Sequence, residues 1–177
     1  MSDLYDHVTA DEDIFKKILS KVPGFSGYIE RNSRRQSDKL LRGVVADNYE
    51  AQWRRISSLQ RDLIKQGQIE YVADVESAAI KIRQFIDRVR TAAYGYAGLF
   101  DAITINQNEL AQLYQYDLAL LQGADEVKGA VDNLETSIGS DGLTAAIRNL
   151  VSVAGKCVEA FNQRAQVITG GAPTASQ

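Results

Sequence analysis

Apolar residues recur along most of this chain at alternating steps of three and four, the spacing that places them on one face of an α-helix. The clearest run extends from residue 68 to about residue 100, and similar runs cover about 107–138 and 142–168. A further run, over about 29–66, has the same spacing in its second half. A stripe of this kind faces a partner helix in a bundle. The pattern therefore predicts four long helices.

A shorter helix is expected before these four. The letters TADE have the spacing of a capping box, in which Thr9 and Glu12 each bond the other's backbone N–H, so the helix is predicted to begin at Thr9. Pro23 ends it, because proline lacks the N–H and its ring clashes with the preceding turn. Gly24 and Gly27 then allow a tight turn.

The links between the long helices are short and lie near residues 67, 106 and 139–142. Helices joined by short links pack as antiparallel neighbours. The predicted fold is therefore all-α, an up-down-up-down antiparallel four-helix bundle of long, coiled-coil-like helices with a short N-terminal helix. Residues 1–169 are expected to form one domain. The remaining stretch, 170–177, has no apolar periodicity and is expected to be disordered.

The composition is that of a soluble protein. Its 177 residues are 45% apolar and 24% charged, a balance that supports a buried core of ordinary size. No uncharged apolar run reaches the roughly 18 residues of a membrane span, and the acidic N-terminus does not resemble a secretory signal. The single Cys157 excludes an internal disulfide and fits a reducing compartment. We therefore expect a cytoplasmic protein.

Charge is distributed unevenly, although the net charge of −3 gives no reason to expect nucleic-acid binding. Residues 29–65 hold nine Lys/Arg against five Asp/Glu, whereas residues 101–141 hold one lysine against eight acids. Two explanations are open. A basic helix lies beside an acidic helix within one fold, or opposite poles of two copies associate head to tail.

Common catalytic and metal-binding patterns are missing from the sequence. A di-metal carboxylate site in a helical bundle needs two Glu-x-x-His pairs, and zinc needs several Cys or His ligands, but the chain has one histidine, His7, and one cysteine. Cys157 lies on an apolar stripe with no histidine to serve as its base. No glycine loop with a phosphate-binding lysine is present. We therefore expect no metal, no cofactor and no catalytic residue.

Charged residues interrupt the apolar stripes near one end of the predicted bundle, which we call the polar pole. Asp117 and Arg164 occupy stripe positions in the last two helices. Extending the stripe of the 29–66 helix backwards adds Arg31, Arg35, Asp38 and Arg42. At about 1.5 Å per residue, Arg42, Asp117 and Arg164 fall at similar heights. The candidate binding residues of the polar pole are Arg31, Arg34, Arg35, Asp38, Arg42, Arg88, Asp117 and Arg164.

Two main interpretations of the polar pole are open. In the first, its arginines pair with Asp38, Asp101 and Asp117 in a partly buried network that fixes the register of the helices. In the second, they form a cationic pocket for an anionic group such as a phosphate, a lipid headgroup or a partner's carboxylate. A catalytic role would depend on a shifted pKa of Asp117 in its apolar seam.

The segment TAAYGYAGLFDAI, residues 91–103, is apolar and aromatic, and its end resembles the Gly-Leu-Phe segments of viral fusion peptides. Glycine is unfavourable inside a helix, so Gly95 and Gly98 indicate a close approach of backbones or the end of a helix. Leu99, Phe100, Ile103 and Ile105 are expected to cover the end of the core. For Leu99 and Phe100, the alternative role is apolar contact with a membrane.

The segments PGFSGYIERNSRRQSDKLLR and AAYGYAGLFDA together resemble a group of uncharacterised prokaryotic helical proteins, over about residues 23–121. The resemblance implies a helical fold and assigns no activity and no site.

Taken together, these features predict a non-enzymatic helical-bundle interaction or scaffold protein that binds a protein partner or itself. One alternative is a peripheral membrane or membrane-stress protein, in which the arginine-rich segment and Leu99–Phe100 contact anionic lipid. The other is a binder of a small anionic ligand at the polar pole.

Overall fold

The computed structural model describes residues 2–92 and 98–170, with side chains from residue 11 onward. Its α-helices are α1 (Ser2–Lys21), α2 (Arg34–Lys65), α3 (Val72–Thr91), α4 (Gln107–Ser137) and α5 (Leu143–Thr169). The short 3-10 helices η1 (Ile69–Tyr71) and η3 (Leu99–Asp101) precede α3 and α4. No β-strand occurs within residues 2–92 and 98–170, so the predicted all-α class is confirmed.

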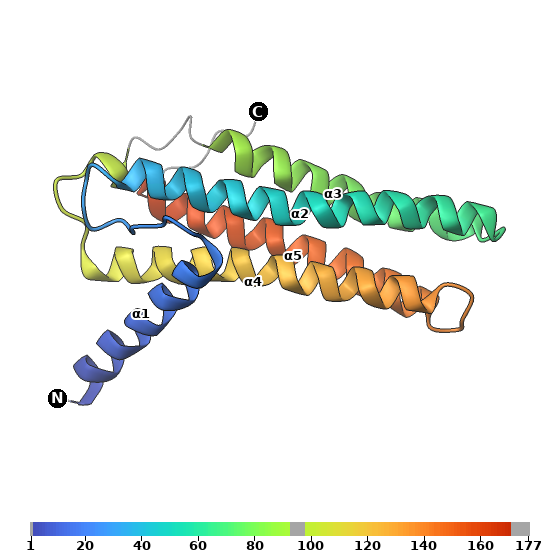
Figure 1. Cartoon of the computed structure of the whole chain (residues 1–177), viewed down its shortest axis with the longest axis horizontal. Helices are drawn as coiled ribbons and strands as arrows, with labels where there is room; N and C mark the ends of the chain where they lie inside the picture. Colours follow the sequence, from blue (N-terminus) through green and yellow to red (C-terminus); the bar gives the residue numbers. More distant parts are fainter. Residues whose placement is uncertain (1, 93–97, 171–177) are drawn as a thin grey trace.

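Helices α2 to α5 lie lengthwise beside one another, and α1 projects from one end of them (Figure 1). Helix α2 packs on α3 and α4, helix α5 packs on the same two helices, and α1 packs on α4. The loops at 22–33 and 98–106 lie at one end, which we call the loop end (Figure 1). The links at 66–71 and 138–142 lie at the other, which we call the link end.

The predicted stripes form the buried faces of the helices. In α5 every stripe residue is buried, including Cys157, Phe161 and Arg164. In α2 the stripe from Val45 to Leu63 is buried apart from Gln52, which is half-buried and accepts a hydrogen bond from Arg55. These faces meet in one continuous apolar core.

The predicted start of the first helix is wrong. Helix α1 begins at Ser2, so Thr9 lies inside the helix and does not cap its N-terminus. Residues 2–8 contain neither proline nor glycine, so nothing in this stretch stops the helix from extending towards the N-terminus. At its other end α1 stops at Lys21, just before Pro23, as expected.

The predicted start of α2 is also wrong, because the helix begins at Arg34 and not near residue 29. The side chain of Arg34 donates to the carbonyl oxygens of Tyr28 and Ile29. Those carbonyls therefore bond to a guanidinium, and the backbone before Arg34 forms bends and turns.

Helix α3 ends at Thr91, earlier than predicted, and Phe100 lies in η3. Gly95 and the predicted stripe positions at 93 and 96 lie outside the described residues. Gly98 meets the expectation of a close backbone approach. A Cβ added there would lie 2.7 Å from the carbonyl oxygen of Ile168, near the end of α5.

Two predicted local signals are confirmed. The Asn106 side chain accepts from the Glu109 N–H at 2.8 Å and the Glu109 carboxylate accepts from the Asn106 N–H at 3.4 Å, which completes a capping box for α4. Gly24 and Gly27 have φ of +84° and +80°, so the turn after α1 uses the left-handed conformations that favour glycine. A Cβ at Gly27 would also lie 2.6 Å from the Tyr114 hydroxyl oxygen.

The basic and acidic segments lie side by side within the fold. Helix α2 packs against α4, and Arg55 of α2 bonds Asp132 at 2.7 Å and Glu135 at 2.9 Å. These contacts favour the first explanation of the uneven charge, a basic helix beside an acidic one, over head-to-tail association.

None of the helices in the described part of the chain combines the length and the apolar character needed to cross a bilayer.

Candidate functional site

Four buried charges from three helices form an ion network near the loop end. Asp38 of α2 accepts from Arg42 Nε at 2.7 Å through one carboxylate oxygen and from Arg164 Nη2 of α5 at 2.6 Å through the other. Arg164 Nε also donates to Asp117 of α4 at 2.5 Å. The side chains of all four are at most 6% exposed. Two arginines and two aspartates balance, so this buried network has no net charge.

Tyr28, in the loop between α1 and α2, completes the network. Its hydroxyl donates to the second oxygen of Asp117 at 2.6 Å. The Tyr28 ring is stacked on Phe100 and Tyr114, with centroid separations of 5.5 Å to each, and Phe25 meets it edge to face. This aromatic cluster covers the end of the core and excludes water from the charges beneath it.

Arg34 acts as a clamp between the two loops. The residue is 1% exposed, and its guanidinium donates to the carbonyl oxygens of Tyr28 at 2.6 Å, Ile29 at 3.2 Å and Ala102 at 2.7 Å. Ala102 belongs to the loop before α4, so one side chain holds the 22–33 loop against the 98–106 loop. The charge of Arg34 is thus directed at backbone carbonyls.

Burial governs the protonation of the network. It raises the pKa of the Asp117 carboxyl, while the charge of Arg164 and the hydrogen bond from Tyr28 act in the opposite direction. Burial also raises the pKa of the Tyr28 hydroxyl well above its usual value, so Tyr28 stays a hydrogen-bond donor. A carboxylate held by two donors, beside a phenol that keeps its proton, is suited to fixing the helices in register.

The outer residues predicted for the polar pole lie apart from the network. Arg31 precedes α2 and is exposed, so its predicted position on the core side of the helix is wrong. Arg35 is exposed and pairs with Asp101 at 2.7 Å, so its predicted inward position is wrong as well. Arg88 donates to Asn162 and lies over the ring of Phe161, away from the network.

The inward face of α2 at this end carries Arg34, Asp38 and Arg42. Extending the stripe backwards at steps of three and four reached Asp38 and Arg42 correctly. Its next step of three reached Arg35, which is exposed, whereas the residue that faces inward is Arg34, four positions before Asp38.

Two exposed isoleucines lie at the loop end. Ile29 is 74% exposed and Ile103 is 84% exposed, so the expectation that Ile103 covers the end of the core is wrong. Arg34 binds the carbonyl of Ile29 itself and the carbonyl of Ala102, which precedes Ile103. Leu99 and Phe100, the predicted apolar contacts, are only 7% and 2% exposed. The expectation that these two residues cover the end of the core is confirmed.

Cys157 is a buried thiol in α5 that accepts a hydrogen bond from the Tyr49 hydroxyl at 2.9 Å. Burial raises its pKa, and the hydrogen bond from Tyr49 only partly opposes this shift. The neutral thiol is a poor nucleophile.

We expect Cys157 to react with Ellman's reagent only when the protein unfolds. The absorbance change should be slow without denaturant and should follow the urea unfolding transition measured by circular dichroism. Rapid stoichiometric reaction of the folded protein, identified by far-UV spectra, would contradict the buried position.

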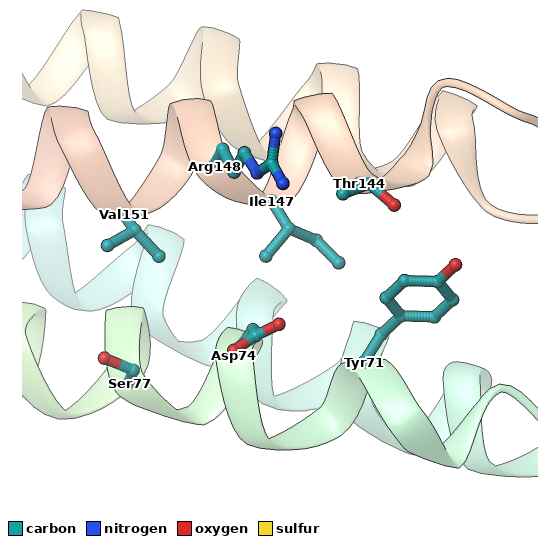
Figure 2. Close-up of a pocket in the computed structure, with 7 residues that line it drawn as sticks. All are labelled: Tyr71, Asp74, Ser77, Thr144, Ile147, Arg148 and Val151. Carbon is teal, nitrogen blue, oxygen red and sulfur yellow. The ribbon is translucent and has the colours of Figure 1, made fainter.

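A pocket of about 330 Å³ opens between the first turns of α3 and α5, towards the link end (Figure 2). We call it the α3–α5 pocket. Its lining residues are Tyr71, Asp74, Ser77, Thr144, Ile147, Arg148 and Val151. None of these residues was predicted to belong to a site, because Ile147 is part of the apolar stripe of α5 and the polar residues lie singly along the chain with no motif spacing.

Within the described residues, no cluster of three or more His, Cys, Asp or Glu side chains is arranged to hold a metal ion. Comparisons with protein-family models, with curated proteins and with solved structures gave no match to this chain.

Proposed function

We propose that this chain is a non-enzymatic, cytoplasmic interaction protein, an up-down-up-down antiparallel four-helix bundle that binds a protein partner through its loop end. The contact residues are Ile29 and Ile103. The observation that carries the proposal is the clamp of Arg34, which holds both loops to one buried guanidinium.

Exposed isoleucines are ordinary when they are single and mobile. Here the carbonyl of Ile29 and the carbonyl of Ala102, just before Ile103, bond to the same side chain, so the two isoleucines belong to one fixed surface. Covering a large aliphatic side chain contributes about 1.5–3 kcal/mol. Holding two of them on a rigid surface lowers the entropic cost of association, because fewer groups have to be ordered on binding.

The chemistry of the polar pole supports a structural role for the charges beneath this surface. The buried network is neutral, and its carboxylates are occupied by arginine and tyrosine donors. An anionic ligand at this site would have to displace Asp38 or Asp117 from the arginines. The sequence-based alternative of a small anionic ligand at the polar pole therefore has less support than an interaction surface above it.

A membrane surface is the alternative occupant of the loop end. Leu99 and Phe100 are buried, so membrane contact through them would require opening the core. Ile29 and Ile103 would need no such opening, and Arg31 is exposed beside Ile29. The exposed acid Glu30 and the Arg35–Asp101 pair offset the attraction that Arg31 exerts on anionic lipid, so we favour a protein partner.

The test compares Ile29→Ser/Ile103→Ser with wild type and with Ile69→Ser, a control at the link end where Ile69 is 66% exposed. Sedimentation velocity over a concentration series measures self-association, and quantitative co-purification from cell extract measures partner binding. We expect one of these signals in wild type and the control, and its loss in the double variant.

Identical behaviour of all three proteins in both measurements would contradict the proposal. Flotation with anionic vesicles distinguishes the membrane alternative. Salt-sensitive flotation that is lost only in the double variant would assign the loop end to a lipid surface.

A further inference from the structure

The α3–α5 pocket has two walls, one from each helix. On the α3 wall, Asp74 and Ser77 follow Tyr71 at steps of three residues. On the α5 wall, Ile147, Arg148 and Val151 lie three, four and seven residues after Thr144, so they share one face of the helix. In Figure 2, Ile147 and Val151 of α5 and the ring of Tyr71 extend into the space between the two helices, with Ile147 near its centre. The side chain of Arg148 lies along α5, and those of Asp74 and Ser77 lie along α3, at the edges of this space. The volume of about 330 Å³ is at the lower end of the range for small-molecule sites.

The polar side chains of this pocket have no bonding partner in the described part of the protein. Within the described residues, no hydrogen bond or ion pair involves the side chains of Tyr71, Asp74, Ser77, Thr144 or Arg148. Hydroxyls elsewhere behave differently, since those of Ser57 and Thr136 donate to carbonyl oxygens one turn earlier in their helices. In the buried network at the loop end every charge is paired. In the α3–α5 pocket, Arg148 and Asp74 come from different helices and are both available to a ligand.

The two charges determine which ligand fits. A simple anion bound to Arg148 would be repelled by Asp74, and a simple cation bound to Asp74 would be repelled by Arg148. A molecule that carries both a negative and a positive group can pair with Arg148 and with Asp74 at the same time. Its carbon chain would cover Ile147, which is buried, and Val151, which is half-buried.

We propose that the α3–α5 pocket binds a small zwitterion. Arg148 binds its carboxylate, Asp74 binds its ammonium group, and the hydroxyls of Tyr71 and Thr144 complete the polar contacts. The ligand class is an amino acid or a short amino-carboxylate.

A series of linear amino acids measures the charge separation that the pocket accepts. The probes are glycine, β-alanine, γ-aminobutyrate and ε-aminocaproate, each titrated into the full-length protein labelled with nitrogen-15. We expect one member to give saturable shifts of amide signals in the first turns of α3 and α5. Butylamine and butyrate, which each carry one of the two charges, should bind about tenfold more weakly or not at all.

Two variants assign the binding to the pocket. Arg148→Gln and Asp74→Asn alter exposed residues, so both should fold, and each should weaken the best probe by about tenfold or more. Lys156→Gln, which removes an exposed charge further along α5, serves as the control and should bind as wild type does.

The proposal is overturned if no member of the series produces saturable shifts, or if both pocket variants bind the best probe as tightly as wild type. It is also overturned if butyrate binds as tightly as the zwitterions, since the site would then be a simple anion site. None of these three results bears on the loop end, because the Ile29→Ser/Ile103→Ser variant leaves this pocket intact.

Discussion

Replacing Arg164 by methionine should lower the free energy of unfolding by about 3–5 kcal/mol, because the change leaves buried carboxylates without their partner. Arg164 is the residue that joins Asp38 of α2 to Asp117 of α4. Methionine keeps much of the side-chain volume, so the loss reports the uncompensated charges more than a cavity. Urea unfolding followed by circular dichroism measures the effect.

A second variant separates charge from packing. Adding Asp38→Asn and Asp117→Asn to Arg164→Met removes the buried negative charges as well, so the triple variant should be more stable than Arg164→Met alone. Arg35→Gln is the control, because Arg35 and its partner Asp101 are both more than half exposed and such pairs contribute about 0–1 kcal/mol. An Arg164→Met protein that is as stable as the Arg35→Gln protein would refute the role of the network.

Replacing Arg34 by methionine should lower the free energy of unfolding by about 3 kcal/mol or more, because three backbone carbonyls lose their donor and each unsatisfied group costs about 1–3 kcal/mol. These carbonyls belong to Tyr28, Ile29 and Ala102. The loops they hold would separate, so hydrogen exchange should accelerate at residues 24–33 and 98–106 more than in the helices.

Arg31→Met is the matched control, since Arg31 is exposed and lies three positions before Arg34. It should change neither stability nor exchange. If Arg34→Met retained wild-type exchange in both loops, Arg34 would not be the clamp. If the variant folds but loses the association that Ile29 and Ile103 support, rigid presentation of the two isoleucines is required for binding.

The two ends of the molecule thus differ in how their polar groups are used. At the loop end, the charges of Asp38, Arg42, Asp117 and Arg164 are directed at one another. At the link end, the α3–α5 pocket holds charged and hydroxyl side chains with no partner in the described part of the protein. In the two proposals, the loop end presents Ile29 and Ile103 to a partner, whereas the α3–α5 pocket presents its charged side chains to a ligand.

The sequence by itself determined the helical class, the buried stripes of α3 to α5 and the capping box at Asn106. Each of these depends on residues within one or two turns of one another, so periodicity and spacing are sufficient to predict them. The same reasoning identified Asp38, Arg42, Asp117 and Arg164, because a charged residue on an apolar stripe has to find a partner inside the fold.

Only the tertiary structure decided the start of α2, the inward position of Arg34 and the exposure of Ile29 and Ile103. The carbonyl of Ala102 that Arg34 binds is 68 positions further along the chain, and no local pattern reports such a partner. The α3–α5 pocket has the same origin, since its charges become neighbours only when the walls of α3 and α5 face each other. Stripes follow from the helical repeat, whereas these sites follow from contacts between segments distant in sequence.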